Sequence, residues 1–188
     1  LMKKKLFTAI GLMSGTSMDG VDLSLLKSDG YSEFTHILDK YFEFDHELQN
    51  NLINLRNKLF TYTDLDKYSR EIREIDKKFT LFNAKIINQI LKDYDDEIDI
   101  VGFHGQTIFH DVENKISKQL GDGKLLSQII QKIVVNNFRQ KDLINGGQGA
   151  PLIPIFHKLL SKFLVKEKHN LDFPLNIINI GGITNITQ

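Results

Sequence analysis

A loop with the residue types of a phosphate-binding site follows the first apolar run of the chain, at residues 15–22. Gly15 lacks a Cβ, so other groups can approach the backbone closely, and successive loop N–H groups can form a concave anion site. Thr16 and Ser17 add hydroxyl groups, and Asp19 offers the hard oxygen that Mg²⁺ prefers. This set of groups suits the phosphates of a nucleotide.

The same composition is also common in ordinary turns, and a simple turn is the alternative interpretation. The loop is not a Walker A motif, because no Gly-Lys-Ser/Thr follows the glycine. It is not the nucleophile elbow G-x-S-x-G either, because Ser17 is followed by Met18, Asp19 and Gly20. Two familiar motif classes are thereby excluded.

Two more polar stretches carry candidate ligand groups. The residues His104-Gly105-Gln106-Thr107 follow the apolar run Ile98–Phe103, and open α/β sheets bind ligands just beyond the carboxyl ends of their strands. Further on, Arg139 and Lys141 can neutralise phosphate or hold a polar substrate. An ordinary strand exit and a solvated loop are the respective alternatives.

Composition excludes several classes of protein. The 188 residues are 41% hydrophobic and 26% charged, which is typical of a globular chain. The net charge is zero, which argues against a nucleic-acid partner. The chain has no cysteine, so thiolate metal sites and disulfides are excluded, and the six histidines show no H-E-x-x-H spacing. No apolar run is long enough for a membrane span, and we expect no membrane partner and a cytoplasmic protein.

Apolar periodicity and turn signals predict the elements that position these groups. Asp45 is the expected cap of one helix and Thr63 of a second, whose apolar stripe is Ile72, Ile75, Phe79, Phe82 and Ile86. We expect strands at Leu6–Met13, Val21–Lys27, Phe34–Phe44, Ile98–Phe103 and Ile133–Val135, and helices from His46, from Thr63 to about Leu91, at Lys124–Gln131 and from Pro151 to about Leu164. The order β-β-β-α-β-α-β is that of a ribonuclease-H-like α/β domain.

The end of the chain echoes its beginning. A predicted strand at Asn176–Ile180 stops at Gly181-Gly182 and resumes at Ile183–Ile186, much as the first strand stops at Gly15. A strand and glycine turn that recur about one domain later indicate a duplicated architecture. We expect a first domain at residues 1–142 and the start of a second at 143–188.

Five blocks taken together resemble the anhydro-N-acetylmuramic acid kinase family. They are GLMSGTSMDGVD at 11–22, GFHGQTI at 102–108, NFRQKD at 137–142, GGQGAPLIP at 146–154 and NIGGITN at 179–185. The resemblance implies the two-domain superfold of sugar kinases, heat-shock protein 70 and actin, with ATP and an amino sugar in the cleft between the domains. It implies hydrolytic opening of the 1,6-anhydro ring coupled to phosphorylation of O6, which gives N-acetylmuramic acid 6-phosphate in peptidoglycan recycling.

The resemblance also implies roles for single residues. Gly181 and Gly182 are the implied start of a second phosphate hairpin, while Mg²⁺ is expected near Asp19, directly or through water, because of the carboxylate in the loop. The implied sugar-side residues are Gln106, Thr107, Arg139 and Asp142. The implied ATP phosphate loop is Gly15, Thr16, Ser17, Met18, Asp19, Gly20, Val21 and Asp22.

The chain departs from the family pattern in two ways. The family usually has Asp-Phe-Arg-Arg-Arg-Asp where this chain has Asn137, Gln140 and Lys141, so one carboxylate and two guanidinium groups are replaced, the second of them by an ammonium. The implied general base lies beyond Gln188, so we expect no catalytic residue within these 188 residues and no activity of this polypeptide alone. A non-catalytic remnant, or a sugar- or nucleotide-binding module, is the rival hypothesis, and a generic carbohydrate kinase is a weaker one. A homodimer is left open.

Overall fold

A mixed β-sheet organises the computed structural model, which describes residues 5–167, 170–180 and 184–188. Strands β1 and β2 form an antiparallel hairpin, β3 extends it, and β1 pairs in parallel with β4 on its other side. The path through the sheet is β3-β2-β1-β4-β5, with β6 also on β4. The strands are β1 (Phe7–Ser14), β2 (Gly20–Ser28), β3 (Phe34–Glu43), β4 (Ile100–Asp111), β5 (Ile116–Leu120) and β6 (Ile133–Asn136).

Strands β5 and β6 share one edge of β4. Strand β6 pairs in parallel with residues 100–103 of β4, and β5 pairs antiparallel with residues 106–111, while β1 occupies the opposite edge from residue 100 to 106. The sheet is therefore five strands wide, in the order β3-β2-β1-β4-β6. Strand β5 follows β6 along the same edge of β4. This arrangement confirms the predicted mixed α/β fold of the ribonuclease-H-like type.

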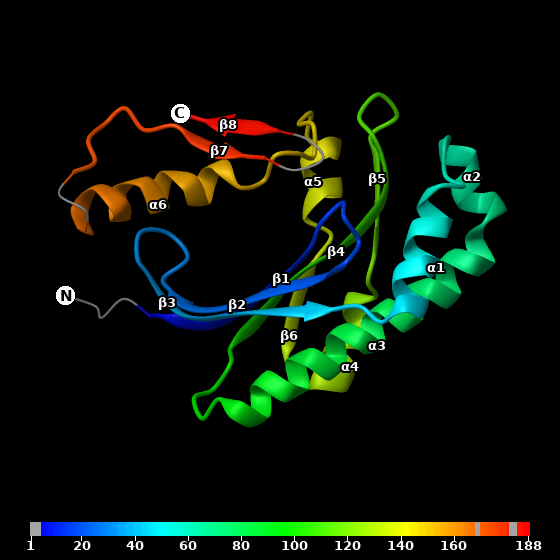
Figure 1. Ribbon diagram of the computed structural model, residues 1–188, viewed down its shortest axis with the longest axis horizontal. Helices are drawn as coiled ribbons and strands as arrows, with labels where there is room; N and C mark the ends of the chain where they lie inside the picture. Colours follow the sequence, from blue (N-terminus) through cyan, green and yellow to red (C-terminus); the bar gives the residue numbers. More distant parts are fainter. Residues whose placement is uncertain (1–4, 168–169, 181–183) are drawn as a thin grey trace.

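Helices lie on both sides of the sheet in Figure 1, with α3 and α4 on one side and α6 on the other. The β7–β8 hairpin forms a second sheet beside α6. Phe34 of β3 packs its ring against Phe156 and Phe163 of α6, at 5.3 Å between centroids in both pairs. The bounds are α1 (His46–Arg56), α2 (Tyr62–Lys67), α3 (Ser69–Asp93), α4 (Gly123–Ile130), α5 (Phe138–Ile144), α6 (Pro154–Glu167), β7 (Ile177–Asn179) and β8 (Asn185–Thr187).

The core lies between the sheet and helices α1, α3 and α4. Leu23 and Leu25 of β2 are fully buried, as the strand alternation requires. Phe79 of α3 stacks on Phe103 of β4 at 6.0 Å and meets Phe44 edge to face at 5.9 Å. The predicted stripe of α3 is confirmed as core: Ile72, Ile75, Phe79 and Ile86 are buried, and Phe82 packs against them.

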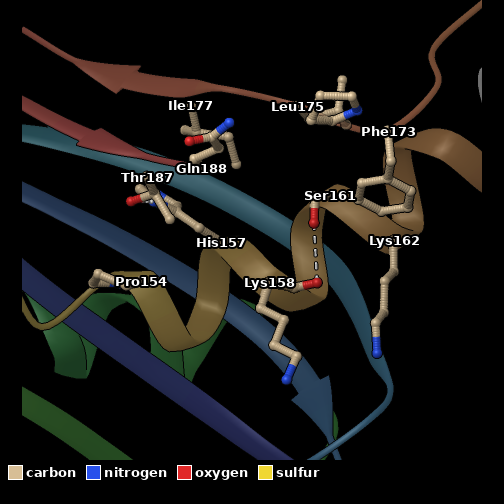
Figure 2. A pocket seen from close by; sticks show the side chains of 11 residues that line it. Pro154, His157, Lys158, Ser161, Lys162, Phe173, Leu175, Ile177, Thr187 and Gln188 are labelled. Carbon is tan, nitrogen blue, oxygen red and sulfur yellow. Dashed lines mark hydrogen bonds between the residues drawn. The ribbon is translucent and has the colours of Figure 1, made fainter.

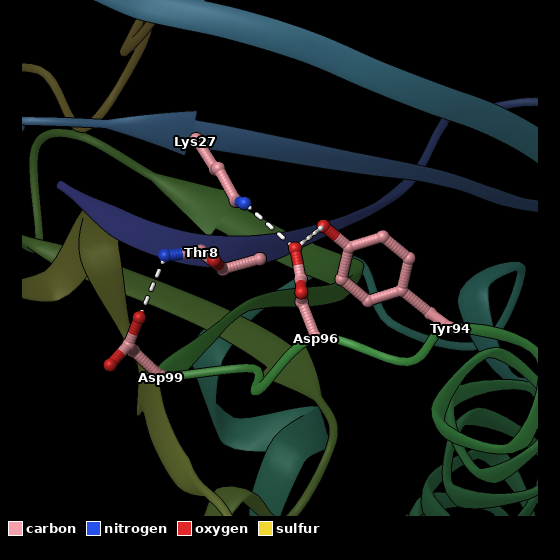
Figure 3. A network of polar contacts seen from close by, with 5 residues as sticks. All are labelled: Thr8, Lys27, Tyr94, Asp96 and Asp99. Carbon is pink, nitrogen blue, oxygen red and sulfur yellow. Dashed lines mark hydrogen bonds and ion pairs between the residues drawn. The ribbon is translucent and has the colours of Figure 1, made fainter.

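A polar network joins the start of the sheet to the turn that enters β4 (Figure 3). The Asp99 carboxylate accepts the Thr8 N–H at 2.8 Å, and the Asp99 N–H donates to the Thr8 carbonyl at 2.9 Å. Lys27 of β2 pairs with Asp96 at 2.8 Å, and the Tyr94 hydroxyl donates to the same carboxylate at 3.3 Å. The register of β4 against β1 is thus fixed at its first residues.

Several predicted boundaries are corrected. Asp45 does cap α1 by accepting the Leu48 N–H at 2.8 Å, but Thr63 is not a cap. Thr61 precedes α2 instead, its N–H bound to Asp64 at 2.8 Å, and Tyr68 separates α2 from α3. A capping box forms at Thr61, whose N–H is bound by the carboxylate of Asp64 at the third helical position.

Further corrections concern the second half of the chain. Strand β4 runs to Asp111 and returns as β5, an element that the prediction missed. Residues 138–142 lie in helix α5 and not in a loop, and α6 begins at Pro154 rather than Pro151. Strand β7 is shorter than predicted, and the predicted turn at Gly181-Gly182 lies outside the described residues. No helix in the described part of the chain is long and apolar enough to cross a membrane.

Candidate functional site

The loop between β1 and β2 is held from beneath by two buried polar side chains. Ser14 Oγ lies 2.5 Å from Gln106 Oε1 and 3.0 Å from the Gly20 carbonyl, and Gln106 Nε2 donates to the Gly15 carbonyl at 3.0 Å. Ser14 and Gln106 are 4% and 1% exposed. Because buried polar groups are costly to leave unpaired, these contacts fix both ends of the loop.

The top of the loop presents polar groups to solvent. Met18 is 1% exposed, with φ at 54°, so its side chain anchors the loop in the core. Thr16, Ser17 and Asp19 are exposed around this anchor, and Ser17 Oγ donates to Asp19 Oδ1 at 2.6 Å. Hydroxyls, backbone and one carboxylate of the predicted phosphate loop are therefore brought together on one surface.

An acidic cluster adjoins this surface. A Cβ on Gly20 of β2 would lie 2.6 Å from the Tyr41 ring, so the ring of this β3 residue can lie against β2 only because position 20 is glycine. Burial, and then the carboxylates of Asp19, Glu43 and Asp22, raise the pKa of the Tyr41 hydroxyl. These carboxylates therefore all lie close enough to the Tyr41 hydroxyl for their charges to act on it.

The donor set fits a cation that keeps water and phosphate ligands. No group of three or more His, Asp and Glu side chains within the described residues is arranged to hold a metal ion. Mg²⁺ bound with a nucleotide needs only one or two carboxylates, because waters and phosphate oxygens complete its octahedron. Asp19 meets that requirement.

Arg56 is a cation at the loop that sequence reasoning missed. It lies in the last turn of α1, and its Nη1 donates to the Thr16 carbonyl at 3.2 Å. The side chain is exposed and forms no ion pair with another described residue, so its remaining N–H groups are free for an anion. The two residues are 40 positions apart, and no local pattern links them.

A second polar cluster is built on a bulge in β4. The register against β1 passes from Leu12↔Phe103 to Ser14↔Gln106, which leaves one extra residue on β4. Gly105 has φ at 78°, and a Cβ there would lie 2.2 Å from the Leu120 carbonyl, so the bulge requires glycine. The bulge directs Gln106 toward the loop and His104 toward α5.

His104 and Arg139 form the centre of this second cluster. Arg139 Nε donates to His104 Nε2 at 2.8 Å, Arg139 Nη1 donates to the Gly149 carbonyl at 2.7 Å, and His104 Nδ1 is 2.7 Å from the Gly105 carbonyl. Burial, and then the charge of Arg139, lower the pKa of His104 to about 4. These contacts assign the proton of a neutral imidazole to Nδ1.

Asp142 holds the glycine-rich segment that follows α5. Its Oδ2 accepts the Gly149 N–H at 2.7 Å, and its carbonyl accepts the Gly147 N–H at 2.9 Å. A Cβ on Gly147 would lie 2.1 Å from Asp142 Oδ2, so the segment can wrap the carboxylate only with glycine there. One oxygen of the Asp142 carboxylate therefore holds the glycine-rich segment in place.

The predicted sugar-side residues are divided between the two clusters. Arg139 and Asp142 both belong to the His104 cluster, through Gly149. Gln106 supports the loop between β1 and β2, and Thr107 Oγ1 accepts from Gln119 Nε2 at 3.2 Å. Strand β4 connects the two clusters. Their roles toward a substrate stay predictions.

Two cavities lie near these elements. A polar cavity of 310 Å³ is bounded by β5, the end of β6 and α5. An apolar one of 720 Å³ lies between α6 and the β7–β8 hairpin, where Figure 2 shows Phe173 and Leu175 opposite α6. His157, at its floor, is hydrogen bonded to Thr187 Oγ1 at 2.8 Å.

Comparison with known proteins decides what kind of chain carries this site. The family model described as anhydro-N-acetylmuramic acid kinase matches residues 7–188. The chain belongs to the anhydro-N-acetylmuramic acid kinase family. The five sequence blocks therefore predicted the family correctly, and both polar clusters belong to a chain of a sugar-kinase family.

Individual relatives agree with this assignment. Three proteins with the name anhydro-N-acetylmuramic acid kinase are similar to this chain. The one from Pelagibacter ubique is 54% identical over 98% of this chain and 48% of its own length. Those from Agrobacterium fabrum and Rhodopseudomonas palustris CGA009 are 39% and 36% identical, over 96% and 97% of this chain and 48% and 49% of their own lengths. The chain spans about half the length of the curated relatives it matches.

Proposed function

We propose that this chain forms the phosphate-loop half of an ATP-dependent kinase. The kinase opens the 1,6-anhydro ring of anhydro-N-acetylmuramic acid and phosphorylates O6, giving N-acetylmuramic acid 6-phosphate for cell-wall recycling. The observation that carries the proposal is the β1–β2 loop, whose exposed hydroxyls and carboxylate rest on the buried Ser14–Gln106 pair in a chain of this family. Phosphoryl transfer depends mainly on such fixed positioning.

The residues of the loop have distinct proposed roles. The backbone N–H groups of Gly15, Thr16 and Ser17 and the hydroxyl of Thr16 bind the phosphates of ATP, and Arg56 adds positive charge beside them. Asp19 would hold Mg²⁺, which neutralises charge on the phosphates when bound. Ser17 Oγ orients the carboxylate by its 2.6 Å hydrogen bond.

In the proposed reaction, water adds to C1, the bond from C1 to O6 breaks, and O6 attacks the γ-phosphorus while ADP leaves. A base must take the proton of the water. The Asp19 carboxylate accepts a hydrogen bond from Ser17 Oγ and lies in the proposed phosphate-binding loop. The Asp142 carboxylate accepts the Gly149 N–H at 2.7 Å. These contacts do not assign the base, and we place it where the family resemblance implies, in the part of the enzyme that follows residue 188.

A fusion tests the kinase directly. Residues 1–188 are joined to the part of the Pelagibacter relative that follows its matched half, and ADP and sugar phosphate are followed together. Asp19→Asn should lower kcat/KM at least about 10²-fold, as loss of one transition-state contact does. Asp95→Asn, an exposed carboxylate in the turn after α3, is the control. Unchanged turnover of the Asp19→Asn fusion at ordinary Mg²⁺ would remove the assignment.

A binding module is the second candidate for the 188-residue polypeptide by itself. The observation that favours it is that Asp19 and Asp142 both have structural hydrogen-bond partners. Mixed with ATP, Mg²⁺ and the anhydro sugar, this polypeptide should form neither product above a no-protein control. Stoichiometric ADP and sugar phosphate, lost in Asp142→Asn, would show that it carries its own base.

A further inference from the structure

The polar cavity of 310 Å³ lies where the fold favours a ligand. Asn136 is the last residue of β6, at the carboxyl end of that parallel strand, and its register partner Phe103 lies within β4 just before the bulge at Gly105; both line the cavity. Crevices at the carboxyl ends of such strands are the usual ligand sites of open α/β sheets. The volume is at the lower end of the range of about 300–1,000 Å³ for small-molecule sites, which suits one sugar ring better than a nucleotide.

Part of the cavity wall is fixed by hydrogen bonds within the fold. Gln140 of α5 accepts the Ser117 N–H at 3.2 Å and donates to the Lys115 carbonyl at 2.9 Å, so both ends of its amide are tied to β5 and the turn before it. His104 is likewise engaged by Arg139 and the Gly105 carbonyl. These residues hold β5 and α5 apart at a set distance.

Other polar groups on the wall lack such partners. The amides of Asn136 and Asn137 and the ammonium of Lys118 form no hydrogen bond or ion pair within the described ranges, and Gln119 uses only its Nε2. A Cβ on Gly123 would lie 2.2 Å from Asn136 Nδ2, so glycine is needed to seat that amide. The cavity thus presents several donors and acceptors at once.

The charge of the wall is carried by one cation. Lys118 is the one lining residue among those described that is charged when His104 is neutral. Asp76 of α3 lies close enough to feel the Lys118 charge, but its carboxylate accepts the Gly121 N–H. A ligand of this cavity therefore gains most from several hydroxyl or amide groups and one negative charge.

We propose that this cavity binds a single-ring amino sugar through its carboxylate, with Lys118 pairing with the carboxylate and Gln119, Asn136 and Asn137 bonding the ring substituents. The inference rests on the proposed function, because it takes the acid group of that substrate as the charged partner. It makes Lys118 the residue that separates anhydro-N-acetylmuramic acid from an anhydro amino sugar without a carboxylate.

The test titrates the 188-residue chain with 1,6-anhydro-N-acetylmuramic acid and with 1,6-anhydro-N-acetylglucosamine, which lacks the carboxylate. Side-chain NH₂ signals in ¹H–¹⁵N spectra report on Gln119, Asn136 and Asn137 individually, and millimolar dissociation constants are measurable this way. The acid should shift these signals and bind about tenfold more tightly than the neutral sugar, as a charge-assisted hydrogen bond implies. Absence of shifts at these amides with millimolar acid would overturn the proposal.

The matched pair of variants is Lys118→Met and Lys124→Met, the latter an exposed lysine of α4 that does not line the cavity. Lys118→Met should remove the tenfold preference for the acid, and Lys124→Met should keep it. Lys118→Gln serves if the methionine variant does not fold. A preference that survives both Lys118 variants, or the same amide shifts with ATP, contradicts a carboxylate-specific sugar site.

The fusion enzyme distinguishes this inference from the kinase proposal. Turnover with an unchanged ratio of KM for the two sugars in Lys118→Met keeps the kinase and overturns the sugar site. Carboxylate-dependent binding at Lys118 in a fusion without turnover keeps the sugar site and overturns the kinase.

Discussion

The large sheet and the β7–β8 hairpin use similar strand residues but are packed very differently. Ile10 of β1 and Leu23 of β2 are 1% and 0% exposed, whereas Ile178 of β7 and Ile186 of β8 are 56% and 67% exposed. Helices α1, α3 and α4 cover the large sheet, while the hairpin has α6 beside it across an apolar cavity. Strand propensity thus produces pairing in both places, and only a covering layer produces a core.

Hydrogen exchange should show the largest difference between the two regions. Amides of the large sheet from Leu6 to Val135 open only with global unfolding, and those after about Phe163 open locally. We expect exchange rates to differ by at least about 10³-fold, since global unfolding costs several kcal/mol. Mass spectrometry of exchanged peptides measures this. Equal protection throughout would show that the hairpin is as well packed as the sheet.

Truncation of one apolar side chain in each region should lower the free energy of unfolding much more in the large sheet than in the β7–β8 hairpin. Leu23→Ala removes a fully buried side chain of β2 and should lower the free energy of unfolding by about 2–5 kcal/mol. Ile186→Ala, at 67% exposure in β8, should change it by less than about 0.5 kcal/mol. Urea unfolding followed by circular dichroism provides both values. Comparable losses would contradict the unequal packing.

The pH dependence of unfolding should sharpen the comparison, because His104 belongs to the large sheet. Its pKa is lowered to about 4 by burial and by Arg139, so the unfolded chain binds the proton more readily. Stability from this group is present above about pH 6.5 and is lost as the pH falls toward 4, by up to about 3 kcal/mol. His104→Gln should flatten this part of the profile, and an unchanged slope in that variant would exclude His104 as its source.

Arg56 should give the smallest effect on stability, although it lies beside the large sheet. Arg56→Gln removes one exposed contact to Thr16 and should change unfolding by less than about 0.5 kcal/mol. In the fusion it should raise KM for ATP several-fold, and more at low salt, because a phosphate partner is lost. Arg73→Gln on α3, exposed and without an ion pair among the described residues, is the control. Equal KM values in the two variants would exclude a phosphate role.

The parts of the fold that follow local signals were predictable from the sequence. Strand β1 alternates along its length and β2 along its first half, and Asp45 precedes α1 with a carboxylate for the first turn. The end of β4 was not predictable in this way. A bulge at Gly105 places polar residues in the middle of a strand, which imitates a strand exit and concealed β5 as well.

The site was predictable only where one segment contains its groups. The hydroxyls and carboxylate of the loop stand within a few positions of Gly15, so composition indicated them. The supports of the loop come from far away: Gln106 is 92 residues from Ser14, and Arg56 is 40 from Thr16. Pairings of this kind arise from the sheet order and helix placement, and single-sequence patterns do not contain them.

The anchoring of the loop by Met18 gives the site a built-in chemical reporter. Met13 of β1 is 44% exposed and Met18 is 1% exposed, so peroxide reaches one thioether and not the other while the loop stays seated. Oxidation at position 18 therefore records each time the loop leaves the core, and oxidation at position 13 calibrates the dose. Mass spectrometry of a proteolytic digest then measures how often the loop leaves the core, from the ratio of oxidation at the two methionines, without a label or a ligand.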